Sequence, residues 1–276
     1  MKKKIMVCML SMILVMSLLA GCAPKEEKKV VKVEEKTKDK AEECELYVFI
    51  AASLKNSMEE IQAAYEKEHP NVTIIYNSDS SGTLQTQIEE GAQCDLFFSA
   101  ATKQMDALND GGFVIPDSSV NLLENKIVLI KAKGADTTVT GFENIPNAAN
   151  LALAGADVPV GQYARKLFET MGTTDAVMSM EINEGANVTA VLTAVAEKSN
   201  EVGIVYATDA ATMPDSVEVI AEATTEQVAP AIYPAGLIKD AEATSATTSA
   251  AKDFLKYLKS EKAMEVFEKA GFIAVK

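Results

Sequence analysis

A buried strand that leads through a serine into a helix is the feature that most constrains the fold of this chain. Residues 46–51 form an apolar run, Ser53 follows, and apolar residues then recur at helical spacing. Such a run is typical of a parallel strand buried on both faces, and serine is favoured at a helix N-cap. Residues 72–76 and Ser81 repeat the arrangement. We therefore expect an α/β fold in which both junctions lie at one edge of a sheet.

The two junctions also predict an anion site. A helix N-terminus presents N–H groups that lack intrahelical acceptors, together with a partial positive charge. Ligands of open α/β sheets bind beyond the carboxyl ends of the strands, which is where Ser53 and Ser81 are expected. Capping alone is the commoner role of such serines, so the pair indicates a site more strongly than either residue does.

The alternation of strands and helices predicts two lobes. In the first we expect strands at 46–51, 72–76 and 95–99 and helices at 54–68, 82–90 and 102–109. In the second we expect strands at 126–131, 151–154 and 203–206 and helices at 161–171 and 188–198. The helices at 249–258 and 261–270 have no sheet of their own and should pack on the first lobe. We predict lobe I at 45–122 and 233–276, lobe II at 123–232, each a mainly parallel sheet flanked by helices, with a ligand in the cleft.

The N-terminal segment predicts export. Three lysines precede an apolar run at 5–20, as in secretory signal peptides. The following Leu19-Ala20-Gly21-Cys22 resembles the lipobox of bacterial lipoproteins, in which the cysteine carries the lipid after cleavage. The resemblance implies a signal peptide at 1–21, a lipid anchor on Cys22 and an extracytoplasmic protein anchored to the membrane; an uncleaved membrane helix is the alternative. The charged segment 22–44 is predicted to be a flexible linker.

Composition excludes several classes of function. The formal net charge is -14 and the only arginine is Arg165, which argues against a nucleic-acid partner. The single histidine, His69, precedes a proline, and no hydrolase, zinc-protease or P-loop motif is present. One histidine and two separated cysteines supply no transition-metal set. We therefore expect a binding protein that is not an enzyme, has no cofactor and has no direct metal-cation site.

Two cysteines remain beyond Cys22. Cys44 and Cys94 each lie two residues before an apolar strand. If those strands are parallel neighbours, the two thiols lie at the same edge of the sheet, and an exported protein can oxidise them. We predict a Cys44–Cys94 disulfide, with two free thiols as the alternative.

Seven segments carry a family resemblance that covers residues 45–276. They are V-F-I-A-A-S-L (48–54), S-S-G-T-L (80–84), D-L-F-F-S-A (95–100), D-V-P-V-G-Q-Y-A (157–164), N-V-T-A-V-L (187–192), G-I-V-Y-A-T-D-A (203–210) and D-F-L-K-Y-L-K (253–259). In order and spacing they resemble the molybdate-binding proteins of bacterial ABC transporters. The resemblance implies a two-lobe periplasmic-binding-protein fold, a monomer, and delivery of the ligand to a membrane permease and its ATPase by lobe closure.

The resemblance also implies the ligand shell. It assigns the oxyanion to the hydroxyl and backbone groups of Ser53 and Ser81, the backbone N–H groups of Val160 and Val188, and the phenol of Tyr206. Neutral donors can satisfy a tetrahedral dianion without a buried lysine or arginine beside it. The chain departs from the commoner pattern at Gly82, where a third serine is frequent, at Val160, where alanine is usual, and in a shorter loop before Val158.

Several functions stay open at this stage. Molybdate and tungstate are too alike in size and charge for the sequence to separate them. Sulfate or phosphate is the alternative ligand, and a protonated phosphate would need a carboxylate in the site. Asp209 is the nearest acidic residue, but we expect it to support the Tyr206 loop instead. A lipoprotein that senses an oxyanion without transporting it is the other alternative.

Overall fold

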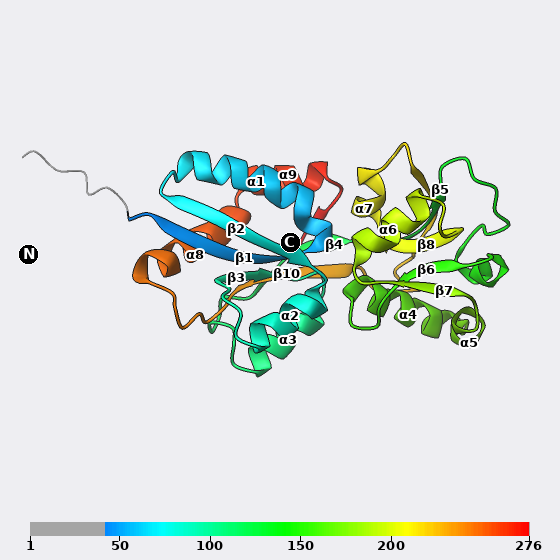
Figure 1. Cartoon of the computed structure of the whole chain (residues 1–276), viewed down its shortest axis with the longest axis horizontal. Coiled ribbons are helices and arrows are strands. Elements are labelled where there is room, and N and C mark those ends of the chain that lie inside the picture. Colours follow the sequence, from blue (N-terminus) through cyan, green and yellow to red (C-terminus); the bar gives the residue numbers. More distant parts are fainter. Residues whose placement is uncertain (1–41, 276) are drawn as a thin grey trace, which may run out of the picture. The chain divides into compact units, whose positions relative to one another are not determined.

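The computed structural model describes residues 42–275, and these residues belong to one compact unit (Figure 1). The predicted signal peptide at 1–21, the lipid anchor at Cys22 and nearly all of the linker lie outside the described residues. Within residues 42–275, no helix has the length and apolar character needed to cross a membrane.

The first sheet has six strands in the order β11-β4-β10-β3-β1-β2. Its strands are β1 (Cys44–Ala51), β2 (Val72–Asp79), β3 (Leu96–Phe98), β4 (Val120–Asn125), β10 (Ala231–Leu237) and β11 (Ile273–Ala274). Its helices are α1 (Lys55–Glu68), α2 (Ser81–Glu89), α3 (Thr102–Asp110), α8 (Ser245–Leu258) and α9 (Glu261–Lys269). Strand β1 pairs in parallel with both β2 and β3, whereas β10 runs antiparallel to β3 and β4.

Strand β1 shows why its sequence reads as a continuous apolar run. Val48 and Ile50 are fully buried in the larger core, with side chains of α1, α8 and α9. Phe49 points to the opposite face and packs with Leu84 of α2 and Leu108 of α3. Helices therefore cover both faces of this sheet, which removes the alternation of apolar and polar residues.

The second sheet has five strands in the order β7-β6-β8-β5-β9. Its strands are β5 (Ile127–Ala132), β6 (Leu151–Ala154), β7 (Ile182–Gly185), β8 (Val202–Tyr206) and β9 (Val217–Glu222). Its helices are α4 (Pro159–Met171), α5 (Thr174–Met178), α6 (Val188–Ala196) and α7 (Ala207–Thr212). Strand β6 is parallel to β7 and β8, and β5 is antiparallel to β8 and β9.

The predicted two-lobe α/β class is confirmed, with one difference in strand direction. The chain passes from the first sheet to the second at Lys126, between β4 and β5, and returns through residues 223–230, between β9 and β10. The strands next to these crossings, β4, β5, β9 and β10, run antiparallel to their neighbours. Both sheets are therefore mixed, where the sequence predicted mainly parallel ones.

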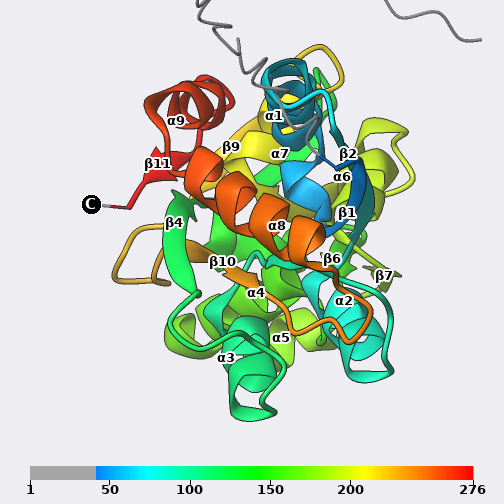
Figure 2. The same cartoon turned by 90° about the vertical axis from the view of Figure 1, so that its left-hand side faces the viewer.

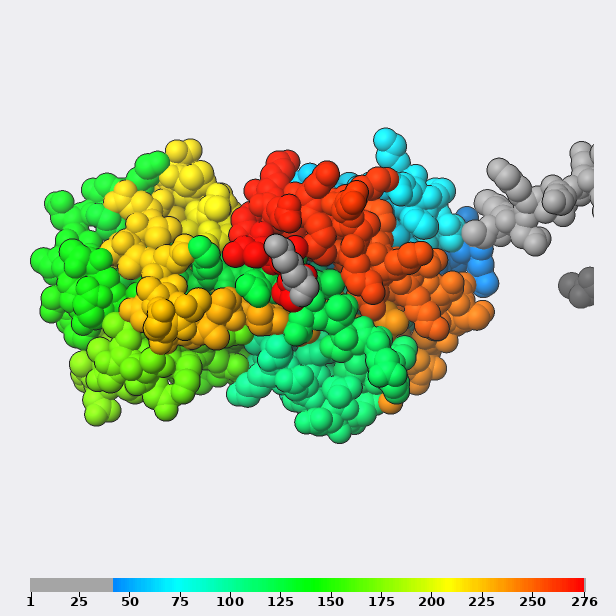
Figure 3. Space-filling model, turned by 180° about the vertical axis from the view of Figure 1, so that it is seen from behind, coloured from blue at the N-terminus to red at the C-terminus, as the bar shows by residue number. Residues whose placement is uncertain are grey.

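The two C-terminal helices return to the first lobe, as predicted. Figure 2 shows α8 running diagonally across the sheet below α9 and α1, and Figure 3 shows α9 beside α1 from behind. Phe254 of α8 meets the ring of Tyr65 of α1 edge-on, with ring centroids 4.8 Å apart. Lys262 of α9 forms an ion pair with Glu68 of α1 at 2.6 Å. This packing buries the C-terminal helices without a sheet of their own.

The predicted Cys44–Cys94 disulfide is wrong, because both thiols are free. Strands β1 and β3 are parallel neighbours, but Val48 pairs with Leu96, so Cys94 lies level with Leu46. Cys44 precedes Leu46 by two residues, so it lies about 6–7 Å along the strand from the level of Cys94. A disulfide needs Cβ atoms about 3.8 Å apart. The thiol of Cys94 instead donates to the carbonyl of Leu96 at 3.4 Å.

Candidate functional site

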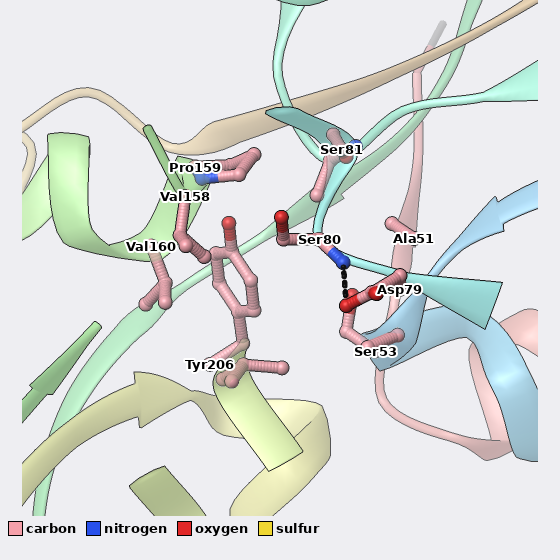
Figure 4. A pocket seen from close by; sticks show the side chains of 12 residues that line it. Ala51, Ser53, Asp79, Ser80, Ser81, Val158, Pro159, Val160 and Tyr206 are labelled. Carbon is pink, nitrogen blue, oxygen red and sulfur yellow. Dashed lines mark hydrogen bonds between the residues drawn. The ribbon is translucent and has the colours of Figure 1, made fainter. Parts of the chain in front are cut away.

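A small cavity between the two lobes brings together the five residues that the resemblance assigned to the ligand (Figure 4). Its lining consists of Ala51, Ala52, Ser53, Asp79, Ser80, Ser81, Ala100, Val158, Pro159, Val160, Val188 and Tyr206. The cavity offers about 10 Å³ to the centre of a water-sized sphere. That is close to the minimum that one enclosed water molecule needs, so the cavity suits a small ion and not a sugar or peptide.

Ser53 reaches the cavity from a tight turn after β1. The predicted N-cap role of Ser53 is wrong, because it lies inside a 3₁₀ turn at Ala52–Leu54, and α1 begins two residues later with Leu54 at its N-cap. The hydroxyl of Ser53 is hydrogen-bonded to the hydroxyl of Tyr233 at 2.9 Å. This bond fixes the side chain beside the cavity even though it caps no helix.

Ser80 and Ser81 divide two roles at the start of α2. Ser80 is the N-cap, and its hydroxyl oxygen accepts from the N–H of Thr83 at 3.1 Å. Ser81 is the first helical residue and is almost fully buried. Its Oγ accepts a hydrogen bond from the N–H of Ala100 at 2.9 Å. This bond uses Ser81 only as an acceptor, so its hydroxyl hydrogen can donate into the cavity.

Two helices of the second lobe begin at the cavity. Val158 is the N-cap of α4, Pro159 occupies its first position and Val160 its second. Val188 is the first residue of α6, whose N-cap is Asn187. First-turn N–H groups have no intrahelical acceptor, so Val160 and Val188 present backbone donors here. Both side chains are buried, which is why their sequence alone reads as ordinary core.

Tyr206 ends β8 with its ring against the cavity. It is 1% exposed, and its hydroxyl makes no hydrogen bond within residues 42–275. In Figure 4 the phenol rises between Val158 and Ser80. Burial raises its pKa well above the usual value, so the phenol stays protonated and can only donate to an anion. An unpartnered buried donor that faces an empty space is a direct indication of a ligand.

Asp79, at the end of β2, is the one charged residue among the lining residues that the sequence analysis did not assign to the site. Its Oδ1 accepts from the N–H of Ser80 at 2.7 Å and from Nδ2 of Asn187 at 3.1 Å. Asn187 caps α6 through its own Oδ1, which accepts from the N–H of Ala190. One carboxylate therefore links the start of α2 in the first lobe to the start of α6 in the second. The sequence Asp79-Ser80-Ser81 is typical of an ordinary helix N-cap, and nothing in it predicts a contact across the cleft.

Asp209, the acidic residue expected nearest the site, does not line the cavity. It is 6% exposed, and burial raises its pKa to about 7, although the backbone N–H groups of Tyr206 and Asp209 partly oppose the shift. The expectation that it supports the Tyr206 segment agrees with these backbone contacts.

Gly82 and Asp157 lie against each other across the two lobes. A Cβ atom added to Gly82 would lie 2.3 Å from the backbone carbonyl oxygen of Asp157. Two of the three departures from the commoner sequence pattern, the glycine at 82 and the short loop before Val158, thus face each other. A serine at 82 could not occupy this arrangement.

The site is electrically neutral apart from one acid. No lysine, arginine or histidine lines the cavity, and within residues 42–275 no group of three His, Cys, Asp or Glu could hold a metal ion. What the lining offers is four hydroxyls, those of Ser53, Ser80, Ser81 and Tyr206, and the first turns of three helices. Oriented neutral donors of this kind bind an anion that brings its own acceptors.

Comparisons with known proteins identify a matching family, similar sequences and a shared fold. A family described as bacterial extracellular solute-binding protein matches residues 46–273. The chain is 37% identical over 258 residues to YvgL of Bacillus subtilis, provisionally named an ABC transporter substrate-binding lipoprotein, with 93% of this chain and 94% of that protein covered. It is 31% identical over 240 residues to the molybdate-binding protein ModA of Haemophilus influenzae, with 85% and 92% covered. The periplasmic molybdate-binding protein of Azotobacter vinelandii shares the fold with a TM-score of 0.72 at 22% identity, over 84% of this chain and 100% of that one.

Proposed function

We propose a function from the premise that this chain belongs to the family of bacterial extracellular solute-binding proteins. The proposed ligand is molybdate, together with tungstate, which has the same charge and shape. The protein binds this oxyanion outside the cytoplasm and hands it to the permease and ATPase of an ABC importer. A lipid on Cys22 holds it at the membrane.

One observation carries the choice of a tetrahedral oxyanion. Ser53, Ser81 and Tyr206 direct hydroxyls to one small cavity, and Val160 and Val188 add backbone donors there. A tetrahedral dianion presents four acceptor oxygens, and neutral donors satisfy them while no buried cation has to be desolvated. The oxyanion also meets the positive ends of three helices, which offset the negative net charge of the chain locally.

The choice of molybdate among such oxyanions rests on the relatives. ModA of Haemophilus influenzae is named for molybdate and is similar to this chain over nearly its whole length. Ser53, Ser81, Val160, Val188 and Tyr206 are the residues that the resemblance assigns to the shell, and all five line the cavity. We assign the ligand contacts to them.

Lobe closure is the proposed step that links binding to delivery. Donors come from both lobes, and Asn187 and Asp79 meet across the cleft at 3.1 Å. An anion that first docks on one lobe gains its remaining hydrogen bonds only when the other lobe arrives, so the ligand stabilises the closed form. The hinges lie at the two crossings, near Lys126 and residues 223–230. The boundaries proposed for the lobes, 45–122 with 233–276 and 123–232, end close to these crossings.

Phosphate is the second candidate, because Asp79 lines the cavity. A carboxylate is the acceptor that a protonated phosphate requires and that molybdate, unprotonated at neutral pH, does not use. Asp79 already receives two hydrogen bonds on Oδ1, which favours a structural role. Asp79→Asn separates the candidates: it should abolish phosphate binding but leave molybdate binding intact or stronger.

A thermal shift experiment tests the proposal. The full chain, produced with its own leader and purified in detergent, is heated with equal concentrations of molybdate, tungstate, sulfate or phosphate. A ligand at 100 times its dissociation constant adds about 2.7 kcal/mol to the free energy of unfolding. We expect large shifts with molybdate and tungstate and none with the others. A shift with sulfate or phosphate alone would show that this anion, and not molybdate, is the ligand. No shift with any of the four would favour a protein without this transport role.

A further inference from the structure

A chain of buried hydrogen bonds runs from the interlobe crossing to Ser53. Asn125 is the last residue of β4, beside the first crossing, and Tyr233 lies in β10, just after the second. Nδ2 of Asn125 donates to the hydroxyl of Tyr233 at 3.3 Å, and that hydroxyl lies 2.9 Å from the hydroxyl of Ser53. Asn125 is 1% exposed and Tyr233 is fully buried. The ligand contacts described above do not explain why Asn125 and Tyr233 are hydrogen-bonded in series to Ser53.

The direction of these hydrogen bonds is fixed at one end. Oδ1 of Asn125 accepts from the backbone N–H of Lys126 at 2.9 Å, and a backbone N–H can only donate. The other side of the amide is therefore the NH₂ group, which also donates to Oγ1 of Thr208, in the second lobe, at 2.8 Å. Asn125 donates to the hydroxyl of Tyr233, and that hydroxyl is in turn hydrogen-bonded to the hydroxyl of Ser53. Ser53 is therefore the cavity end of a network whose other end is fixed at the crossing.

We propose that Asn125 and Tyr233 are positioning residues that hold the Ser53 hydroxyl in place for the ligand. This inference rests on the proposed function and deepens it. Ser81 is held in a similar way by the N–H of Ala100, so each of these two ligand hydroxyls of the first lobe is fixed by a second hydrogen bond.

The geometry gives the chain of bonds a second consequence. Asn125 touches Thr208 of the second lobe while it orients a ligand residue of the first. The Ser53 hydroxyl is therefore held in position from the crossing, whether or not the ligand is bound. A hydroxyl that is already held in position loses little rotational freedom on binding, which favours a higher affinity for the ligand.

A double-mutant cycle tests the positioning role. Calorimetry measures molybdate binding to the wild-type full chain and to its Tyr233→Phe, Ser53→Ala and doubly substituted variants. We expect Tyr233→Phe to weaken binding about 10-fold and Ser53→Ala about 10- to 100-fold. If Tyr233 acts through Ser53, its substitution in the Ser53→Ala background weakens binding by less than about 2-fold.

Controls separate positioning from general damage to the core. Tyr65→Phe removes another buried hydroxyl, which has no hydrogen-bond partner within residues 42–275 and lies outside the cavity lining, and should leave affinity unchanged. Asn125→Leu removes the amide without adding charge and should weaken binding in the wild type but not further in Tyr233→Phe. Additive losses in either cycle, with molybdate still bound by the wild type, overturn the positioning role and leave the proposed function standing. A wild-type protein that binds none of the four oxyanions overturns the proposed function, and the positioning role with it.

Discussion

The two lobes supply the same kind of chemistry to the cavity by different means. The first lobe contributes Ser53 and Ser81, whose hydroxyls are each oriented by another hydrogen bond. The second contributes backbone N–H groups at Val160 and Val188, which the helices α4 and α6 orient, and the phenol of Tyr206. A side-chain donor can be deleted by one substitution, whereas a backbone donor survives nearly all of them. The two halves of the site should therefore respond differently to mutation.

The contact between the lobes is where the largest effect is expected. Gly82→Ala places a Cβ atom against the carbonyl oxygen of Asp157, so the lobes cannot meet as they do here. Loss of two or more hydrogen bonds to a charged ligand is worth about 3–6 kcal/mol. We expect molybdate binding measured by calorimetry to weaken by about 100-fold or more.

The matched control for Gly82 lies one turn later in α2. Thr86 is exposed, and Thr86→Ala should leave affinity unchanged. Without ligand, the free energy of unfolding of Gly82→Ala should not fall, because alanine is the better helix former. Normal affinity in Gly82→Ala would show that ligand binding does not require the lobes to meet at this point.

A deletion in the first lobe is expected to have the next largest effect. Ser81→Ala removes a hydroxyl donor and should weaken molybdate binding by about 1.5–3 kcal/mol. It also leaves the N–H of Ala100 without its acceptor, so stability falls too. Ser118→Ala is the control, because the hydroxyl of Ser118 likewise accepts a backbone N–H, from Leu237 at 3.1 Å, but lies outside the cavity lining. Equal affinities for the two variants would remove Ser81 from the shell.

A test of the second lobe needs a substitution that removes a backbone N–H donor. Val188 is the first residue of α6, a position that tolerates proline, and Asn187 before it is extended, with φ -155° and ψ 176°. Val188→Pro therefore removes the N–H and keeps the helix. We expect calorimetry to show a loss of about 1–2 kcal/mol in molybdate binding. Val188→Ala, which keeps the N–H, should change affinity by less than about 0.5 kcal/mol. Equal losses would show that the valine side chain, not the backbone, matters.

The difference between the lobes also explains what the sequence could predict. Ser53 and Ser81 stand out because a polar residue between an apolar strand and an amphipathic helix has few structural explanations. Val160 and Val188 carry no such signal, and only the family resemblance identified them. Asp79 escaped because its contact with Asn187 joins residues 108 apart in sequence. The disulfide prediction failed for a related reason: neighbouring strands were identified, but their register, which separates Cys44 from Cys94, depends on packing of the whole sheet.

The smallest effect concerns Asp209, whose carboxylate accepts from the backbone N–H of Tyr206. It tests whether the second lobe also depends on a side chain. Burial raises the pKa of this carboxyl to about 7, whereas in the unfolded chain it is about 3.9. Between these values the folded state binds the proton more tightly, so the free energy of unfolding falls as pH rises from about 4 to about 7.

Asp209→Asn removes this dependence. In urea unfolding without ligand, we expect the wild type to lose about 1 kcal/mol more than the variant between pH 5 and pH 6. Asp95, whose pKa burial raises to about 6, acts in the same direction but is present in both proteins, so its contribution cancels. Parallel pH profiles for the two proteins would show that Asp209 is ionised without penalty, and that the Tyr206 segment is held by its backbone alone.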